Sequence, residues 1–423
     1  MSETIKRSRL RNGVVVLTDR MTNIRSVTLG VFMRSGARDE PESLNGVTHF
    51  IEHAVFKGSL SRSQREIAFL TDRLGGGLEA FTMHEETAFA IKAVDNEVET
   101  AFDLIADMVT SPAFHESDLK SEQKVIIEEI KMTDDNPEEH LSDLFNARLF
   151  GDHPLGAPIA GTPKTVKTFG RKQVLAFHRK LIAPHNLVIV AAGNVEHREI
   201  VALAKKYFGK LKASARRVQR QKSPSMLSPL FVKQRRGLEQ SHFVLATPFM
   251  NADSDSRYAG ELLVNILGGG TSSRLWQRIR EDRGLAYSVG ASGAMYRDCG
   301  VFSVYAGTSP ECLMEAIEIS MAEMRDITRN GIGKEELELA KTQAISSIIL
   351  GLEDSSNRAA SLARLEMVHG RQISVDETIS KISKTRPKDI LSVARRYFRG
   401  DSVAIGAIGD LPKLRLTKKI VSL

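Results

Sequence analysis

Two hydrophobic stretches far apart in the sequence end in nearly the same way. Residues 187–194 read LVIVAAGN and residues 403–410 read VAIGAIGD, so each is an apolar run that closes on glycine followed by Asn or Asp. Short apolar runs that end at a turn residue are typical of buried strands. The recurrence predicts a duplicated domain in which each half closes on one such strand.

The segments before these two strands also follow a common order. Each half has a β-rich stretch, then a strand pair, then a long helix; the ranges are 27–34, 80–94 and 116–132 in the first half and 241–247, 286–307 and 334–350 in the second. Strands mixed with helices in this way are typical of α+β proteins. We therefore predict two homologous α/β-sandwich domains, each a mainly antiparallel sheet packed by helices.

A basic stretch rich in Ser and Pro, residues 213–240, separates the two halves. It predicts domains at 1–212 and 241–423 that are joined by a linker. Much of the net charge of +7 lies in this stretch, at Arg216, Arg217, Arg220, Lys222, Lys233, Arg235 and Arg236. Because the stretch has no interleaved aromatic residues and no recognisable nucleic-acid module, a solvated linker is favoured over an RNA- or DNA-binding arm.

The composition limits the class of protein. With 423 residues, 42% hydrophobic and 26% charged, the chain reads as globular, and no apolar run is long enough to cross a membrane. The N-terminus lacks an apolar stretch of the signal-peptide type, and strand-like residues begin by Val14. Cys299 and Cys312 form no C-x-x-C pair, so we expect reduced core thiols and a prokaryotic cytoplasmic protein with no signal or transit peptide.

The motif HFIEH at residues 49–53 indicates a metal site. If residues 42–56 form a helix, His49 and His53 lie about 40° apart around its axis, so both can reach one metal ion. Glu52 borders the same face, where a carboxylate can take a proton from a zinc-bound water and pass it to a leaving amine. A histidine pair at this spacing can also be an ordinary surface or core pair. The H-x-x-E-H spelling, however, is the inverzincin signature.

A catalytic zinc usually has three protein ligands and one open position for water, so a third ligand must come from another segment. The predicted helix at 116–132 offers Glu122, Glu128 and Glu129, and composition alone does not choose among them. The matching helix of the second half reads ISSII at 345–349, and that half has no HxxEH motif. We therefore expect the second half to bind no metal and to serve another purpose, such as enclosing the substrate.

Five passages together resemble the pitrilysin/insulinase family of zinc metallopeptidases, in the branch that is similar to the mitochondrial processing peptidase and its short bacterial relatives. They are RSGARDE at 34–40, HFIEH at 49–53, GGGLEAFT at 75–82 with Glu85, VIIEE at 125–129, and LGGGTSSR at 267–274 continuing to REDRGLAYS at 280–288. These passages span most of the chain in the family's order.

The resemblance implies a metal site and its ligands. It implies one zinc ion per chain, bound by His49, His53 and Glu129, with Glu52 as the general base. Glu122 matches an acid that supports the site without binding the metal.

The resemblance also assigns a pair of residues in the second half. Arg280 and Tyr287 match a family pair that reaches substrate bound at the zinc. Arg280 is expected to hold a substrate carbonyl, and Tyr287 is expected to donate to the oxyanion of the tetrahedral intermediate.

A substrate-binding edge strand is implied at Glu79, Ala80, Phe81 and Thr82, where the family takes a peptide as an added β-strand. Glu79 departs from the family, which usually has Asn at this position. An anion there could favour peptides with basic residues near the cut. Alternatively, Glu79 could pair with a local Lys or Arg and leave specificity unchanged.

These features predict a zinc-dependent endopeptidase that hydrolyses unfolded peptides or short protein segments. A homodimer is expected, because family members of this length commonly pair. The alternative is a non-catalytic scaffold or partner subunit of a heteromeric peptidase complex, as occurs among relatives that have lost metal ligands. A purely structural zinc is disfavoured, because structural sites are normally closed by four ligands and favour Cys.

Overall fold

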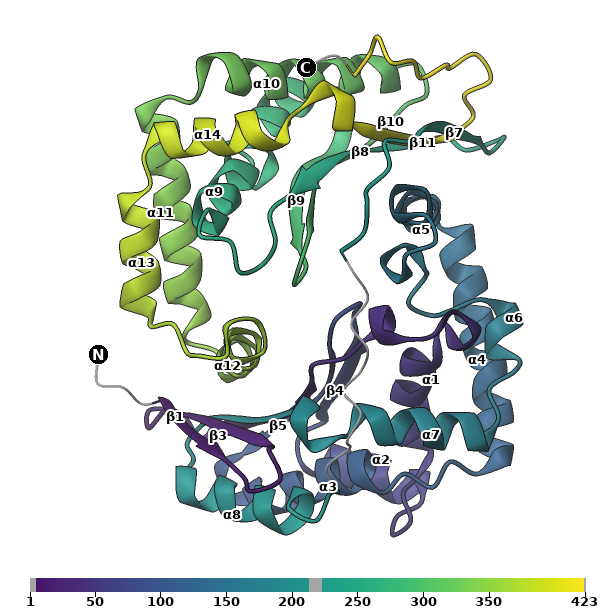
Figure 1. The fold of residues 1–423 in the computed structure, drawn as a ribbon, viewed down its shortest axis with the longest axis vertical. Helices are drawn as coiled ribbons and strands as arrows, with labels where there is room; N and C mark the ends of the chain where they lie inside the picture. Colours follow the sequence, from purple (N-terminus) through teal and green to yellow (C-terminus); the bar gives the residue numbers. More distant parts are fainter. Residues whose placement is uncertain (1–4, 213–222, 422–423) are drawn as a thin grey trace. The chain divides into compact units, whose positions relative to one another are not determined.

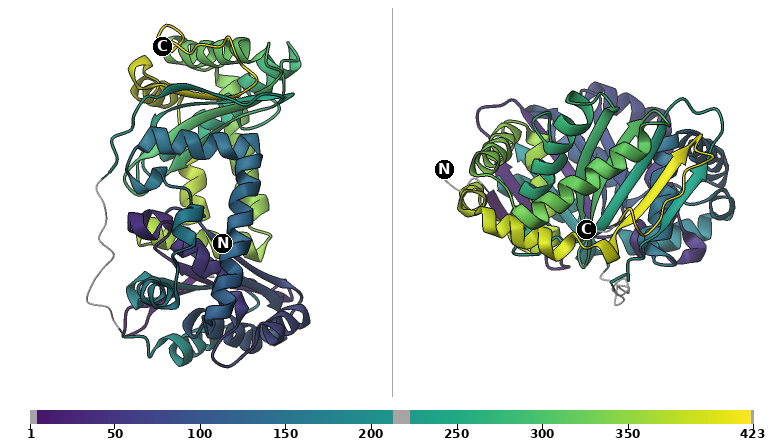
Figure 2. Two further views of the ribbon diagram at one scale, coloured as in Figure 1. Left: turned by 90° about the vertical axis from the view of Figure 1, so that its right-hand side faces the viewer. Right: turned by 90° about the horizontal axis from the view of Figure 1, so that it is seen from above.

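The computed structural model describes residues 5–212 and 223–421, which fall into two compact units. Unit 1 consists of Met1–Met132, Ala157–Gln221 and Leu350–Gln372, and unit 2 consists of Thr133–Gly156, Lys222–Ile349 and Ile373–Leu423. Each unit is built around one β-sheet with helices packed against it (Figures 1 and 2). The predicted α+β class is confirmed.

The sheet of unit 1 has six strands in the order β1-β2-β6-β3-β5-β4. Their bounds are β1 Ile5–Arg9, β2 Val15–Arg20, β3 Ser26–Met33, β4 Gly77–Thr82, β5 Thr87–Val94 and β6 Leu187–Gly193. The sheet of unit 2 has five strands in the order β7-β11-β8-β10-β9. Their bounds are β7 Leu230–Gln234, β8 Ser241–Phe249, β9 Ala286–Met295, β10 Gly300–Thr308 and β11 Ala404–Gly409.

The two sheets share one topology apart from the additional β1. β2 runs parallel to β6, and β7 runs parallel to β11 at the matching place. The other neighbouring strands are antiparallel in both sheets. The internal duplication predicted from the sequence is therefore present in the fold.

The glycines that end β6 and β11 have a common physical reason. A Cβ atom on Gly193 would collide with the carbonyl oxygen of Ser26, and a Cβ atom on Gly409 would collide with the side chain of Ser241. Ser26 and Ser241 are the first residues of the adjacent strands β3 and β8. The recurrent glycine thus allows a close approach between neighbouring strands.

The helices are listed here by unit. Those of unit 1 are α1 Val47–Ala54, α2 Gln64–Arg73, α3 Val98–Thr110, α4 Glu116–Asp135, α6 Pro163–Val166, α7 Arg171–Leu181, α8 His197–Phe208 and α12 Ser355–His369. Those of unit 2 are α5 Pro137–Phe150, α9 Arg257–Gly268, α10 Leu313–Asn330, α11 Lys334–Gly351, α13 Val375–Lys384 and α14 Pro387–Tyr397. The last residues of α4 belong to unit 2, and those of α11 belong to unit 1.

Each sheet has an inner strand, β6 in unit 1 and β11 in unit 2, that is buried on both faces. In β6, Leu187 and Ile189 belong to one hydrophobic cluster, whereas Val188 and Val190 belong to another on the opposite face. The strand therefore has no solvent-facing side and reads as a continuous apolar run in the sequence. In β11 the alternate residues divide between two clusters in the same way.

The second face of each sheet is covered by a helix from the other half of the sequence. Ala359, Leu362 and Ala363 of α12 complete the second cluster of unit 1. Leu141 and Phe145 of α5 occupy the corresponding cluster of unit 2. The predicted domain boundaries of 1–212 and 241–423 are therefore wrong for residues 133–156 and 350–372, which belong to the opposite units.

The predicted linker is shorter than expected. Arg216, Arg217, Arg220 and Lys222 lie outside the described residues. Residues 230–234 form β7, which pairs with β11, so this part is an integral strand. Arg235 is not merely solvated, because its Nη1 donates to the Asp134 carbonyl oxygen at the end of α4 at 2.9 Å.

Two further predictions concern membrane segments and cysteines. Across the described residues, no helix combines the length and apolar character needed to cross a bilayer. Cys299 is buried, Cys312 is half-buried, and both are free thiols.

Polar contacts also fasten α12 to the sheet of unit 1. The buried Glu366 carboxylate accepts two hydrogen bonds from Arg7, both at 2.9 Å, and one from Arg34 Nη2 at 3.2 Å. Arg358 Nη1 lies 2.8 Å from Asp19 Oδ2 on β2. Thr28 Oγ1 of β3 also lies 2.8 Å from Ser355 Oγ at the start of α12. Together these polar contacts fix the position of α12 on the sheet.

Replacing Glu366 by Gln is expected to lower the free energy of unfolding by about 1–2 kcal/mol, because charge-assisted hydrogen bonds to both arginines are lost. Urea denaturation of the purified protein measures this change. The matched control is Asp401→Asn, which removes an exposed contact with Arg399 and is expected to change stability by less than about 0.5 kcal/mol. Equal stabilities of the two variants would contradict the inference that Glu366 holds α12 against the sheet of unit 1.

Candidate active site

The helix that carries the HxxEH motif begins later than predicted. The sequence predicted a helix over residues 42–56, whereas α1 spans Val47–Ala54 and a separate 3₁₀ turn covers Glu42–Leu44. Gly46, the residue that immediately precedes α1, has a φ of 93°, a left-handed conformation that favours glycine. A Cβ atom at Gly46 would also lie 2.6 Å from the Ala160 carbonyl oxygen, so the chain can enter α1 only through glycine here.

A buried carboxylate fixes the start of α1. Glu40 is 4% exposed and accepts hydrogen bonds from the backbone N–H groups of Gly46 at 2.7 Å and Thr48 at 2.6 Å. Burial raises the pKa of Glu40 to about 7, although these hydrogen bonds oppose the rise. The carboxylate satisfies donors that a helix N-terminus otherwise leaves unpaired. The sequence assigned no role to Glu40, although it ends the RSGARDE passage.

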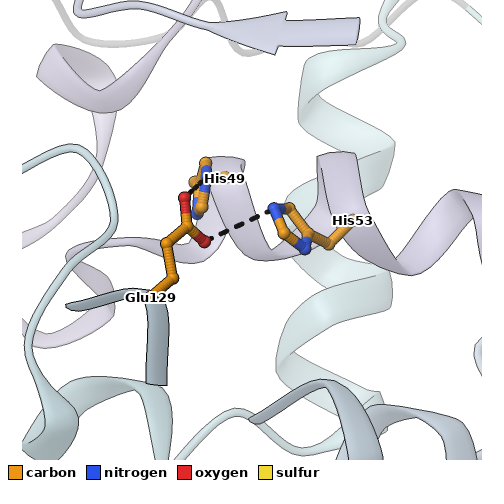
Figure 3. A group of neighbouring side chains, drawn as sticks. All are labelled: His49, His53 and Glu129. Carbon is orange, nitrogen blue, oxygen red and sulfur yellow. Dashed lines mark ion pairs between the residues drawn. The ribbon is translucent and has the colours of Figure 1, made fainter. Parts of the chain in front are cut away.

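Three side chains from two helices converge in unit 1, as Figure 3 shows. His49 and His53 come from consecutive turns of α1, with ring centroids 4.6 Å apart. Glu129 comes from α4; its Oε1 lies 3.6 Å from His49 Nε2, and its Oε2 lies 3.7 Å from His53 Nε2. The histidines and one of the three candidate acids are thus brought together.

This geometry fits a zinc ion. Ligand atoms at about 2.0–2.1 Å from a tetrahedral zinc are about 3.3–3.4 Å apart, close to the separations between Glu129 and each histidine. Glu129 Oε2 is buried and has no hydrogen-bond partner among the described residues. A cation between the three side chains would supply the missing interaction.

The protonation of the two histidines differs because their surroundings differ. Burial, helped by the neighbouring His53, lowers the pKa of His49 to about 4, so His49 is a neutral imidazole with a free lone pair at neutral pH. A hydrogen bond to Glu122 raises the pKa of His53. Because His53 Nδ1 donates to Glu122 Oε1 at 2.9 Å, the other ring nitrogen of neutral His53 can face a metal.

Glu122 occupies a supporting position. It is buried, and its second oxygen lies 2.7 Å from Lys57 Nζ. Although burial alone would raise the pKa of Glu122, hydrogen bonds from His53 and Lys57 hold it below its ordinary value. Lys57 was not among the predicted site residues, although it lies one helical turn after His53. Glu128, the remaining candidate acid, pairs with Lys131 at the exposed side of α4.

Glu52 lies beside the three converging side chains and is oriented by the strand β4. Thr82 Oγ1 donates to Glu52 Oε2 at 2.6 Å. Burial raises the pKa of Glu52, and the Thr82 hydrogen bond partly counteracts this rise. A cavity of about 270 Å³ adjoins the group and is lined by Glu52, His53, Phe56, Lys57, Ala80 and Glu122.

The predicted substrate strand β4 is an edge strand, since it pairs with β5 alone. Its residues alternate between the two faces: Ala80 and Thr82 face the cavity and Glu52, whereas Phe81 packs against the cluster that contains α12. Glu79 is exposed and makes no ion pair with any described residue. The alternative in which Glu79 pairs with a local Lys or Arg is therefore not realised.

Arg280 and Tyr287 lie together in unit 2. Arg280 belongs to a π-helical turn, Trp276–Glu281, and Tyr287 is the second residue of β9. The Arg280 guanidinium carbon lies 4.9 Å from the centre of the Tyr287 ring, and Tyr287 is 80% exposed. The other predicted site residues all belong to unit 1.

Two protein-family models match successive parts of the chain. Residues 15–163 match the family described as "Insulinase (Peptidase family M16)", and residues 168–344 match the "Peptidase M16 inactive domain". The chain is 35% identical over 421 residues to an uncharacterized zinc protease of Streptomyces coelicolor, which covers 96% of this chain and 90% of the relative. This chain belongs to the insulinase family. The predicted resemblance is thus confirmed.

A second curated relative and two solved structures are also similar to this chain. An uncharacterized zinc protease of Bacillus subtilis, YmxG, is 34% identical to this chain over 410 residues. The match covers 96% of this chain and 100% of the relative. Among solved structures, a protease from Helicobacter pylori has a TM-score of 0.89 at 22% identity, covering 96% of this chain and 99% of that one. A Pseudomonas fluorescens structure titled as a peptidase M16 inactive domain has a TM-score of 0.90 at 19% identity, covering 98% and 99%. These two structural likenesses concern the fold alone.

Replacing Glu122 by Gln is expected to weaken zinc binding by about 10–100-fold, because the acceptor that orients His53 loses its charge. Competition with a chromogenic chelator measures the zinc affinity. The control is Glu128→Gln on the same helix, whose carboxylate contacts Lys131 instead of a histidine. If both variants lose the same zinc affinity, the loss results from removing any negative charge on α4 and not from losing the hydrogen bond between Glu122 and His53.

Proposed function

We propose that the protein is a zinc-dependent endopeptidase that hydrolyses unfolded peptides or short protein segments. The observation that carries this proposal is the convergence of His49, His53 and Glu129. Beside them lies the Glu52 carboxylate, which accepts a hydrogen bond from Thr82. Three ligating groups next to an additional carboxylate are the elements of metal-assisted peptide hydrolysis. The naming of relatives as zinc proteases supports the same proposal.

One zinc ion per chain is proposed, held by His49, His53 and Glu129. These three residues form the only such group of His, Cys, Asp and Glu side chains found within the described part of the chain. When bound there, zinc would lower the pKa of a water molecule and polarise the scissile carbonyl. Glu122 is proposed to act through His53, by fixing its ring orientation.

Glu52 is proposed as the general base and, later, the general acid. Thr82 holds Oε2 of the Glu52 carboxylate, which leaves Oε1 to take a proton from water and pass it to the leaving amine nitrogen. Burial raises the pKa of the Glu52 carboxyl above its ordinary value, which makes the carboxylate a stronger proton acceptor. Thr82 is thus proposed to have two roles: it belongs to the strand that binds substrate, and it orients the general base Glu52.

The substrate is proposed to bind as an added strand along β4. The free edge of β4 presents backbone donors and acceptors from Glu79 to Thr82, and only an extended, unfolded segment can pair with them. Because backbone pairing does not depend on side chains, a broad range of sequences would bind. Unpaired Glu79 is proposed to favour peptides with a basic residue near the cut.

The metal-free half is proposed to complete the site with Arg280 and Tyr287. Arg280 would donate to a substrate carbonyl oxygen, and Tyr287 O–H would donate to the oxyanion formed during attack. Under this proposal the HxxEH half is the catalytic part and the half that follows residue 240 supplies substrate contacts.

The rival function, a scaffold or partner subunit without activity, has less support. Such a subunit would not need a ligand set together with a base and a substrate edge. We further propose a homodimer, which light scattering of the purified protein can test. A cytoplasmic location stays a prediction from the sequence.

Glu52→Gln is expected to lower kcat for an unfolded peptide by about 10²–10⁴-fold while the bound zinc stays stoichiometric, because a positioned base is lost and the ligands are kept. A quenched-fluorescence peptide assay and metal analysis measure the two quantities. If the zinc-loaded wild-type protein cuts no unfolded peptide, or if Glu52→Gln is equally active, the scaffold alternative is favoured.

Glu79→Asn is expected to reduce the preference for Lys or Arg near the cut by about two- to fivefold, as for the loss of one exposed ion pair. Mass spectrometry of a digested peptide library measures the preference. The control is Glu99→Gln, an exposed acid on α3 that contacts Lys206. Unchanged cleavage profiles in Glu79→Asn would remove Glu79 from the specificity determinants.

A further inference from the structure

A third aromatic side chain accompanies Arg280 and Tyr287. Trp276, the only tryptophan in the sequence, has its ring centre 4.2 Å from the Arg280 guanidinium carbon. The same guanidinium lies over the Tyr287 ring at 4.9 Å. Arg280 is therefore in contact with the faces of two aromatic rings at once. Nothing in the sequence motif assigns a role to Trp276.

Local structure fixes the indole. Trp276 and Arg280 lie in the π-helical turn Trp276–Glu281, where the wider winding brings residues four apart close together. Trp276 Nε1 donates to Glu281 Oε1 at 2.9 Å. Leu275, just before this turn, and Ile279 within it are fully buried and anchor the turn to the core of unit 2.

The N–H groups of Arg280 are largely unused within unit 2. Among the described residues, the guanidinium has one ion-pair contact, from Nε to Glu281 Oε1 at 3.8 Å, and it donates no hydrogen bond. A contact between a guanidinium and the face of an aromatic ring does not depend on a conventional hydrogen bond from the N–H groups. The two aromatic contacts thus restrain the position of the guanidinium without using its N–H groups, which make no hydrogen bond to the described residues and can donate to a ligand oxygen.

We propose that Trp276 is a positioning residue that holds the Arg280 guanidinium ready to donate to a peptide oxygen. This inference rests on the proposed function, in which Arg280 binds substrate. Trp276 restricts the rotamers of a long, flexible side chain before substrate arrives, so less conformational entropy is lost on binding. Its effect therefore falls on substrate binding and not on zinc.

The kinetic test compares Trp276→Leu with Trp276→Phe in the zinc-loaded full-length protein. Trp276→Leu is expected to raise KM about two- to fivefold, the equivalent of one cation–π contact, with kcat nearly unchanged. Trp276→Phe keeps a ring face and is expected to stay close to the wild type. Zinc affinity is expected to be the same in all three proteins.

A double-mutant cycle separates a role through Arg280 from a general structural one. In an Arg280→Ala background, Trp276→Leu is expected to have no further effect on KM, because the group that it positions is already absent. Additive effects, or a Trp276→Leu variant with the wild-type KM, would overturn the proposal.

The lone tryptophan also provides a binding assay that needs no hydrolysis. A Trp-free unstructured peptide is titrated into zinc-loaded Glu52→Gln protein while the Trp276 emission is recorded. A saturable change in emission that is lost in Glu52→Gln/Arg280→Ala is expected, and an unchanged emission would overturn the proposal. If the emission changes but the wild-type protein cuts no peptide, the proposed function fails while the role of Trp276 is supported.

Discussion

Burial of both faces of each sheet is the constraint on which the rest of the fold depends. A strand such as β6, apolar along its whole length, must be covered twice, and the helices of its own half cover one face only. The other face is closed by a helix from the opposite half, α12 in unit 1 and α5 in unit 2. The reciprocal exchange uses the same element of each repeat, since α5 follows α4 as α12 follows α11. Neither unit is therefore a contiguous piece of the chain.

Within unit 1, the contact between α1 and α4 determines what the site can do. The hydrogen bond from His53 to Glu122 joins α1 directly to the face of α4 that carries Glu122. Glu129 follows Glu122 by seven residues, nearly two full turns, so both acids point to that same face. The contact that orients His53 thus also sets the direction from which Glu129 reaches the histidines. Glu128, one residue earlier, is turned about 100° away and meets Lys131 instead.

Electrostatics at the site follow from unequal burial. The pKa of His49 is low because the imidazole is buried beside another histidine, whereas the pKa of His53 is raised by its hydrogen bond with Glu122. Burial raises the pKa of the Glu52 carboxyl, whereas the pKa of Glu122 lies below its ordinary value in spite of burial. Glu122 receives hydrogen bonds from both His53 and Lys57, while Glu52 receives one from the neutral hydroxyl of Thr82. Two carboxyl groups near His53, one from α1 and one from α4, thus acquire different properties, which is the arrangement that acid–base chemistry needs.

The sequence by itself determined what depends on short-range pattern: the repeated strand and turn, the α+β class, the spacing of His49 and His53, and the acids that could join them. Spacing left three acids open and only the family resemblance pointed to Glu129; the tertiary structure shows that Glu129 is the one that faces the histidines. Tertiary structure alone decided where α1 begins after Gly46, which unit receives α5 and α12, and whether Glu79 has a partner among the described residues. Periodicity reports which side of an element is apolar, because that depends on neighbours within a turn or two. It does not report which distant element covers that side, because long-range contacts are fixed only when the whole core is packed.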